Sequence, residues 1–153
     1  MGIARILVPI DYSDNSRAAL AYAADLAKSF GASLDLVHVW DRPTYATDAV
    51  MVQRPGEAHK PIAELIRENA EKDMAELLAS LTLPSELKVE SRLLSGDPAS
   101  ALLAELKKGA HDLVVISTHG RTGLAHLLLG SIAEKLVRLS PVPVLTVPIP
   151  GTR

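Results

Sequence analysis

Short apolar runs alternate with longer amphipathic segments along the whole chain. Most of the apolar runs are nearly continuous, which is typical of strands buried on both faces of a sheet. The predicted strands are Ile6–Pro9, Ser33–Val39, Leu87–Leu94, Leu113–Ile116 and Val142–Val147. The longer segments repeat apolar residues every three or four positions and predict helices over residues 18–30, 61–81, 101–108 and 131–139.

This alternation of strands and helices predicts an α/β fold with a doubly wound, five-stranded parallel sheet. Right-handed crossovers place helices on both faces of such a sheet, so we expect a three-layer, Rossmann-like domain with the strand order 3-2-1-4-5. Residues 41–60 interrupt the alternation with Pro43, Pro55 and Gly56 and are predicted to form a mobile surface loop.

Composition narrows the classes of protein that this domain can belong to. The 153 residues suffice for one self-supporting domain, spanning residues 1–153. Cysteine is absent, which excludes a disulfide framework and a thiol nucleophile. A net charge of −2 and only five aromatic residues (one Trp, three Tyr, one Phe) argue against a nucleic-acid partner. No apolar run approaches the length of a membrane span, so we expect no membrane contact and a cytoplasmic location.

The most informative segment begins with a predicted buried strand and runs through a glycine-rich loop to a helix start. It reads Val114-Val115-Ile116-Ser117-Thr118-His119-Gly120-Arg121-Thr122-Gly123, followed by Leu129-Gly130-Ser131-Ile132. Glycines allow positive φ and close backbone approach, and Ser131 is positioned to cap the helix. The free N–H groups of a helix N-terminus bind anions, so the segment predicts a phosphate cradle. An ordinary strand-to-helix connection is the alternative.

The predicted topology places this loop where ligands bind in open α/β sheets. For the order 3-2-1-4-5, the strand order reverses between the first and fourth strands, and a crevice opens at their carboxyl ends. The loops there are residues 9–13 and 117–120. The first loop lacks the G-x-G-x-x-G of a dinucleotide-binding domain, and the chain has no G-x-x-x-x-G-K-[ST] of a P-loop NTPase.

Several segments together resemble the universal stress protein family. They are Ile6-Leu7-Val8-Pro9-Ile10-Asp11-Tyr12-Ser13, Val37-His38-Val39, Gly96-Asp97-Pro98, residues 115–131 and Pro141-Val142-Pro143-Val144-Leu145. The ATP-binding members of that family carry G-x-x-G, nine residues, and then G-[ST]. Here Gly120 is separated by nine residues from Gly130-Ser131, whereas Ser117 replaces the first glycine. If residue 117 needs positive φ, serine is strained there and weakens binding; if the position only has to be small, its hydroxyl can add a contact.

The resemblance implies ATP as the ligand, with any Mg²⁺ held mainly by the phosphates. Asp11 is expected to accept from a ribose hydroxyl or the adenine edge, although an Asp before a helix can also be its N-cap. The resemblance also makes Val39 an adenine-pocket residue. The complete predicted site comprises Pro9, Ile10, Asp11, Val39, Ile116, Ser117, Thr118, His119, Gly120, Arg121, Gly123, Gly130, Ser131 and Ile132. No catalytic or metal-ligating residue is assigned.

The expected function is that of an ATP-binding regulatory module that acts during stress on an unidentified protein partner. The resemblance also implies a homodimer, formed through the C-terminal strand. Two alternatives remain: a slow ATP-hydrolysing enzyme of the same fold, and a protein-interaction module that binds no nucleotide.

Overall fold

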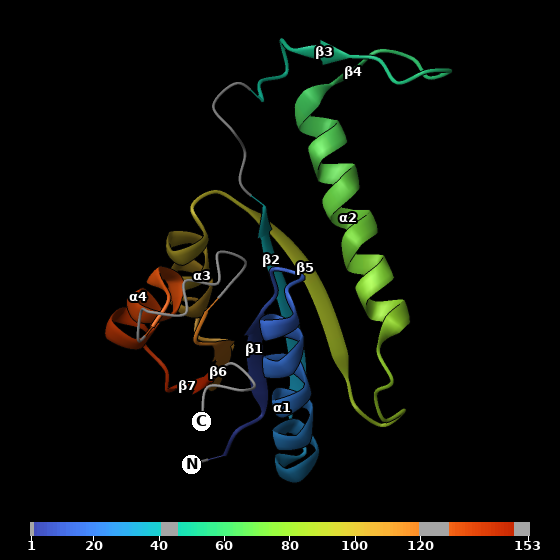
Figure 1. The fold of residues 1–153 in the computed structure, drawn as a ribbon. Helices are drawn as coiled ribbons and strands as arrows, with labels where there is room; N and C mark the ends of the chain where they lie inside the picture. Colours follow the sequence, from blue (N-terminus) through green and yellow to red (C-terminus); the bar gives the residue numbers. More distant parts are fainter. Residues whose placement is uncertain (1, 41–45, 120–128, 149–153) are drawn as a thin grey trace.

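The computed structural model describes residues 2–40, 46–119 and 129–148. Seven strands and four helices follow one another in the described ranges (Figure 1). Their bounds are β1 Arg5–Pro9, α1 Asp14–Phe30, β2 Ser33–Trp40, β3 Met51–Val52, β4 Lys60–Pro61, α2 Ile62–Ser80, β5 Val89–Ser95, α3 Pro98–Leu106, β6 Leu113–Ser117, α4 Ser131–Leu139 and β7 Val144–Val147.

Five of the strands form a parallel sheet in the order β5-β2-β1-β6-β7. Counted along the chain within this sheet, the order is 3-2-1-4-5, which confirms the predicted doubly wound α/β fold. Helices α1 and α2 lie on one face of the sheet, and α3 and α4 lie on the other (Figure 1). Strands β5 and β7 form the two edges.

The core consists of two aliphatic clusters, one on each face of the sheet. Alternate residues of β1 divide between them: Ile6 and Val8 pack toward α1 and α2, whereas Leu7 packs toward α3 and α4. Small side chains of α1 such as Ala23 are fully buried, which lets this helix approach the sheet closely. No described Phe, Tyr or Trp side chain is fully buried.

The predicted ends of the elements are correct to within a few residues, with physical reasons for the differences. Helix α1 begins at Asp14, earlier than predicted, because the Ser13 side chain accepts from the amide of Ser16 and caps it. Asp97 caps α3 in the same way, with Pro98 in its first turn, so this helix also begins earlier than predicted. Strand β7 begins only after Pro143, which lacks the amide that a ladder needs.

The segment over residues 41–60, predicted to be a mobile surface loop, contains strands in its described part, residues 46–60. Strands β3 and β4 form a short antiparallel pair that leads into α2. The amide of Ile62 donates to the carbonyl oxygen of Val50 and extends the pairing by one bond. This hairpin lies at the end of α2 that is farther from the sheet (Figure 1). Within the described ranges, no helix has the length and apolar character needed to cross a membrane.

A buried carboxylate joins three elements near the amino ends of the strands. Asp35 of β2 is fully buried and accepts from Arg92 of β5, with 3.1 Å between Nε and Oδ1. His111, in the loop before β6, places Nε2 2.7 Å from Oδ2 of the same carboxylate. Arg92 also reaches Glu105 of α3 at 2.7 Å. Burial alone would raise the pKa of Asp35, but the hydrogen bonds from His111 and Arg92 and the nearby positive charges hold it well below its usual range.

We expect Asp35 to make folding sensitive to acid. Its pKa is lower in the folded than in the unfolded chain, so its contribution is complete above about pH 5 and is lost as the pH falls below about 4. Asp35→Asn should lower the free energy of unfolding at pH 7 by about 3–5 kcal/mol and flatten its decline in acid. Urea titrations between pH 7 and pH 3 measure both effects.

Asp25→Asn, on the exposed side of α1, is the matched control and should follow the wild-type pH profile. An Asp35→Asn protein that loses stability in acid as steeply as the wild type would show that other carboxylates govern the transition.

Candidate functional site

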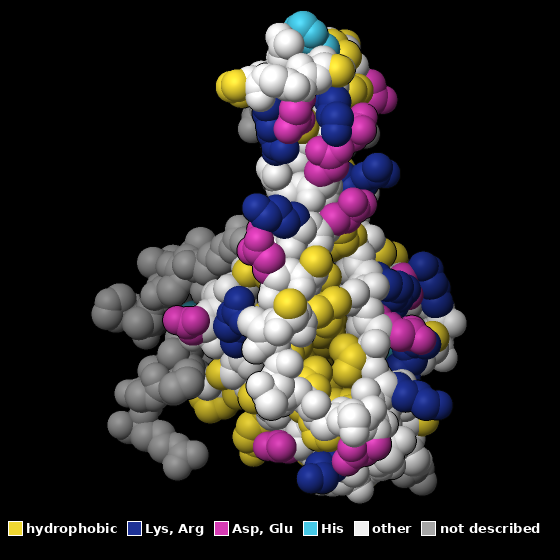
Figure 2. Space-filling view, turned by 90° about the vertical axis from the view of Figure 1, so that its right-hand side faces the viewer, with side chains coloured by type: hydrophobic (Ala, Val, Ile, Leu, Met, Phe, Trp, Pro, Cys, Tyr) yellow, Lys and Arg dark blue, Asp and Glu magenta, His cyan; other side chains and the backbone are white. Residues whose placement is uncertain are grey.

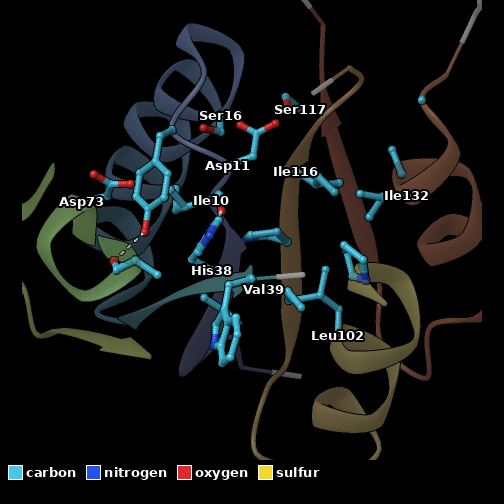
Figure 3. Close-up of a pocket in the computed structure, with 18 of the residues that line it drawn as sticks. Ile10, Asp11, Ser16, His38, Val39, Asp73, Leu102, Ile116, Ser117 and Ile132 are labelled. Carbon is cyan, nitrogen blue, oxygen red and sulfur yellow. Dashed lines mark hydrogen bonds between the residues drawn. The ribbon is translucent and has the colours of Figure 1, made fainter. Parts of the chain in front are cut away.

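A cavity of about 610 Å³ opens at the carboxyl ends of β1, β2 and β6. This is the edge of the sheet where the strand order reverses between β1 and β6, as predicted for the ligand crevice. Asp73, Ile10 and His38 lie on one side of the cavity, and Ile116, Ile132 and Leu102 lie on the other (Figure 3). Both helical layers therefore contribute walls.

Ten of the fourteen residues predicted for the site line this cavity. They are Pro9, Ile10, Asp11, Val39, Ile116, Ser117, Thr118, Gly130, Ser131 and Ile132. His119 is described but does not line it. Gly120, Arg121 and Gly123 lie outside the described residues. Tertiary structure thus brings together two sequence segments that lie more than a hundred residues apart.

Asp11 follows the last residue of β1 by two positions and organises the turn into α1. Its Oδ1 accepts from the backbone amide of Ser13 at 3.0 Å and from the Ser13 hydroxyl at 2.5 Å. Ser13 itself caps α1, so the alternative that Asp11 is the N-cap is wrong. The Asp11 carboxylate lies between the labelled Ser16 and Ser117 side chains at the cavity (Figure 3).

Tyr12 adopts a backbone conformation that L-residues with bulky side chains rarely use. Its φ is 65°, and it is the one non-glycine residue with positive φ in the described ranges. The Tyr12 hydroxyl donates to the carbonyl oxygen of Ala70 in α2 at 3.3 Å. Its ring lies 4.5 Å, between centroids, from the ring of His38, whose Nδ1 is 2.7 Å from the carbonyl oxygen of Ile10. Contacts with α2 and β2 therefore hold this turn in place.

Ser117, which replaces the first glycine of the family's motif, is not strained. It is absent from the described non-glycine residues with positive φ, so the strain alternative is wrong. The Ser117 hydroxyl instead donates to the carbonyl oxygen of His119 at 2.8 Å. The serine side chain therefore stabilises the start of the loop that follows β6.

Gly130, and not Ser131, occupies the N-cap position of α4. Ser131 is the first residue of the helix, and no side chain caps it, so the predicted capping role of Ser131 is wrong. Gly130 has an ordinary φ of −67°, and its amide donates to the carbonyl oxygen of Thr118 at 2.6 Å. A Cβ atom there would lie 2.9 Å from that oxygen. Glycine is required here because two backbone segments meet. The start of α4, which no side chain caps, lines the cavity through Ser131, Ile132 and Ala133.

Sequence reasoning missed the contribution of α2. This helix adds Ile66, Asn69, Ala70 and Asp73 to the lining. Their spacing places them on one helical face, and the interruption of the apolar stripe by Asn69 and Asp73 was a usable signal. The other lining residues that were not predicted are Tyr12, Ser16, Val37, His38, Trp40, Pro98, Leu102 and Ala133.

The profile of the universal stress protein family matches residues 2–148. The chain belongs to this family. A universal stress protein of Methanocaldococcus jannaschii is 31% identical over 95% of the chain and 82% of its own length. A universal stress protein of Thermus aquaticus is 36% identical over 93% of the chain and 96% of its own length.

Solved structures of family members share the fold. Universal stress protein UspA from Lactobacillus plantarum superposes with a TM-score of 0.71 at 23% identity, covering 96% of this chain and 99% of its own. A universal stress protein solved in complex with cAMP has a TM-score of 0.60 at 26% identity, covering 96% and 98%. An Arabidopsis thaliana family member with bound AMP has a TM-score of 0.58 at 14% identity, covering 97% and 93%.

Gly130→Ala tests the close approach of α4 to the loop after β6. The added Cβ would press on the Thr118 carbonyl oxygen, and one of the two backbone segments would have to move. We expect the free energy of unfolding to fall by about 1–3 kcal/mol in a urea titration. Gly2→Ala, where a Cβ meets nothing within 4 Å, is the control and should stay within about 0.5 kcal/mol of the wild type. Equal stability of the two variants would contradict this role of Gly130.

Proposed function

We propose that this protein is a regulatory module that binds ATP in the cavity at the carboxyl edge of the sheet. One observation carries the proposal: the uncapped start of α4 and the carboxylate of Asp11 converge on the same cavity from opposite sides of the strand-order reversal. A helix N-terminus attracts phosphate, and a carboxylate accepts hydrogen bonds from hydroxyl or amino groups. A nucleotide offers both kinds of group, and two structural neighbours carry cAMP or AMP.

We assign each residue a role from its position around the cavity. In this proposal the amides of Ser131 and Ile132 bind phosphate oxygens, and Asp11 accepts from the ribose or the base. Val39 and Ile116 supply apolar walls on the α3 and α4 side of the sheet. Gly120, Arg121 and Gly123 complete the proposed phosphate site by their place in the sequence motif. Mg²⁺ would be bound through the phosphates.

We further propose that the protein acts as a homodimer joined through β7. This strand is an edge of the sheet, and its outward-facing backbone groups are those of Val144 and Thr146. The carbonyl oxygens of Pro143 and Val147 accept hydrogen bonds from amides of β6 and of the residue that follows it, so the backbone groups of these two residues face β6. Because the direction of the backbone groups alternates along a strand, those of Val144 and Thr146 face outward. The exposed apolar side chains of Val137 and Leu139 lie on α4, the helix that contacts β7. Two-fold pairing would cover this edge and leave other surfaces for a downstream partner.

ATP binding is tested by isothermal titration calorimetry on the wild type and on Asp11→Ala. We expect the variant to bind ATP at least about tenfold more weakly, because a charge-assisted hydrogen bond is lost. Ser13→Ala is the control, since it disturbs the same turn but keeps the carboxylate. It should weaken binding less than Asp11→Ala does.

Chromatography of the same samples over several hours should show intact ATP. Steady release of ADP would favour the enzymatic alternative. A wild-type protein without measurable affinity for ATP would refute the proposed function.

The dimer is tested by sedimentation velocity on Thr146→Pro. Proline removes an outward-facing amide of β7 and leaves the bonds to β6 untouched, so we expect a monomer where the wild type is a dimer. Thr146→Val keeps the amide and should remain dimeric. A monomeric wild type at micromolar concentration would refute the dimer, and a dimeric Thr146→Pro protein would place the interface elsewhere.

A further inference from the structure

Aromatic side chains gather at the cavity although they are rare in the chain. The sequence holds only five Phe, Tyr and Trp residues, and the described core is aliphatic. Two of the five, Tyr12 and Trp40, line the cavity together with His38. All three are half-buried. Large aromatic side chains normally stabilise a protein by filling its core, so their placement at a cavity points to a ligand with a planar ring.

These aromatic residues belong to only one half of the cavity. Ile10 and Tyr12 pack with the cluster on the α1 and α2 face of the sheet, and His38 follows Leu36 of that cluster by two positions in β2. Val39, Leu102 and Ile116 pack with the cluster on the other face. Figure 3 shows the same division, with Ile10, His38 and Asp73 apart from Leu102, Ile116 and Ile132. The proposed phosphate site belongs to the half formed by β6 and α4, which leaves the aromatic half without a role.

Contacts within the protein hold the aromatic half in place. Tyr12 is kept at a φ of 65° although its side chain is bulky, and such outliers cluster at ligand sites. Its hydroxyl is bonded to the backbone of Ala70, and its ring packs against His38 at an interplanar angle of 41°. Asn69 and Asp73, on the same face of α2 as Ala70, add polar groups at the exposed rim. A carboxylate there can accept a hydrogen bond from an amino group on a ring.

We propose that this half of the cavity binds a second planar heterocycle, so that the preferred ligand is a dinucleoside polyphosphate. One nucleoside end of this ligand and its phosphates occupy the half of the cavity that includes Gly130, Ser131 and Val39. The other ring stacks on the aromatic group of Tyr12, His38 and Trp40, and its amino group donates to Asp73. This inference rests on the proposed nucleotide binding and adds a second site to it. The continuous cavity lets one molecule reach both halves.

The test compares the affinity of the full-length protein for ATP with its affinity for diadenosine polyphosphates of three, four and five phosphates, by isothermal titration calorimetry. Stacking of one base on aromatic side chains predicts that the best of these ligands binds about tenfold more tightly than ATP. The fluorescence of Trp40, the single tryptophan of the chain, gives an independent signal from the same half.

Two variants test whether the tighter binding of the diadenosine polyphosphate depends on the aromatic half of the cavity. Tyr12→Asn removes the ring but keeps a residue that tolerates positive φ, and Asp73→Ala removes the carboxylate from an exposed helix position. In each variant the best diadenosine polyphosphate should bind less than about threefold more tightly than ATP. Glu76→Ala, on α2 but outside the cavity lining, is the matched control and should keep the wild-type ratio.

The outcomes separate this inference from the proposed function. Binding of ATP with no gain for any diadenosine polyphosphate would overturn the second site and leave nucleotide binding standing. A gain that survives in both variants would also overturn it. Absence of binding by every nucleotide would refute both proposals.

Discussion

The pairing of β1 with β6 is the constraint on which the site depends. The chain leaves β1 toward α1 on one face of the sheet and leaves β6 toward α4 on the other face. The two turns therefore diverge from neighbouring strands, and a crevice opens between them. The cavity follows from this topology, and the residues of both turns face it because the strands are parallel and end at the same edge (Figure 3).

Each wall of the cavity is fixed by a single unusual backbone feature. On one side, Tyr12 takes a positive φ that its contacts with Ala70 and His38 maintain. On the other side, the amide of Gly130 lies 2.6 Å from the carbonyl oxygen of Thr118, where no Cβ would fit. Both features restrict the backbone at the two turns that lead into the cavity, so the shape of its walls is fixed by the protein itself.

A network of hydrogen bonds and ion pairs lies at the opposite end of the sheet. Asp35 ties β2 to β5 and to the loop before β6, and its neighbours reach α3 through Glu105. Asp112 accepts from the amides of Ala4 and Arg5 at 2.9 and 3.0 Å and holds the segment that enters β1. Figure 2 shows the face that carries α2, where charged side chains cover the upper part of this helix and apolar side chains lie lower down. Because Asp35, Arg92 and Asp112 lie away from the cavity edge, changes in the ligand site need not disturb them.

The sequence by itself determined the fold class, the strand order and the sheet edge at which the site lies. Continuous apolar strands and amphipathic helices are local signals, and local signals fix roughly where elements begin and which faces they bury. The loop over residues 117–120 and the turn at Asp11 could be assigned to one crevice because the topology of parallel sheets is so restricted.

Only the tertiary structure decided what each residue does there. Gly130 was predicted to let the backbone come close to a phosphate, but in the structure the segment that it meets is Thr118, which is twelve residues away in the sequence. The choice between the two alternatives for Ser117, strain or an added contact, depended on a φ value that no neighbouring residue reveals. The wall formed by α2 depends on where this helix packs, since spacing along a helix defines a face but not what that face meets. Such contacts between distant segments are set by packing, which sequence periodicity does not encode.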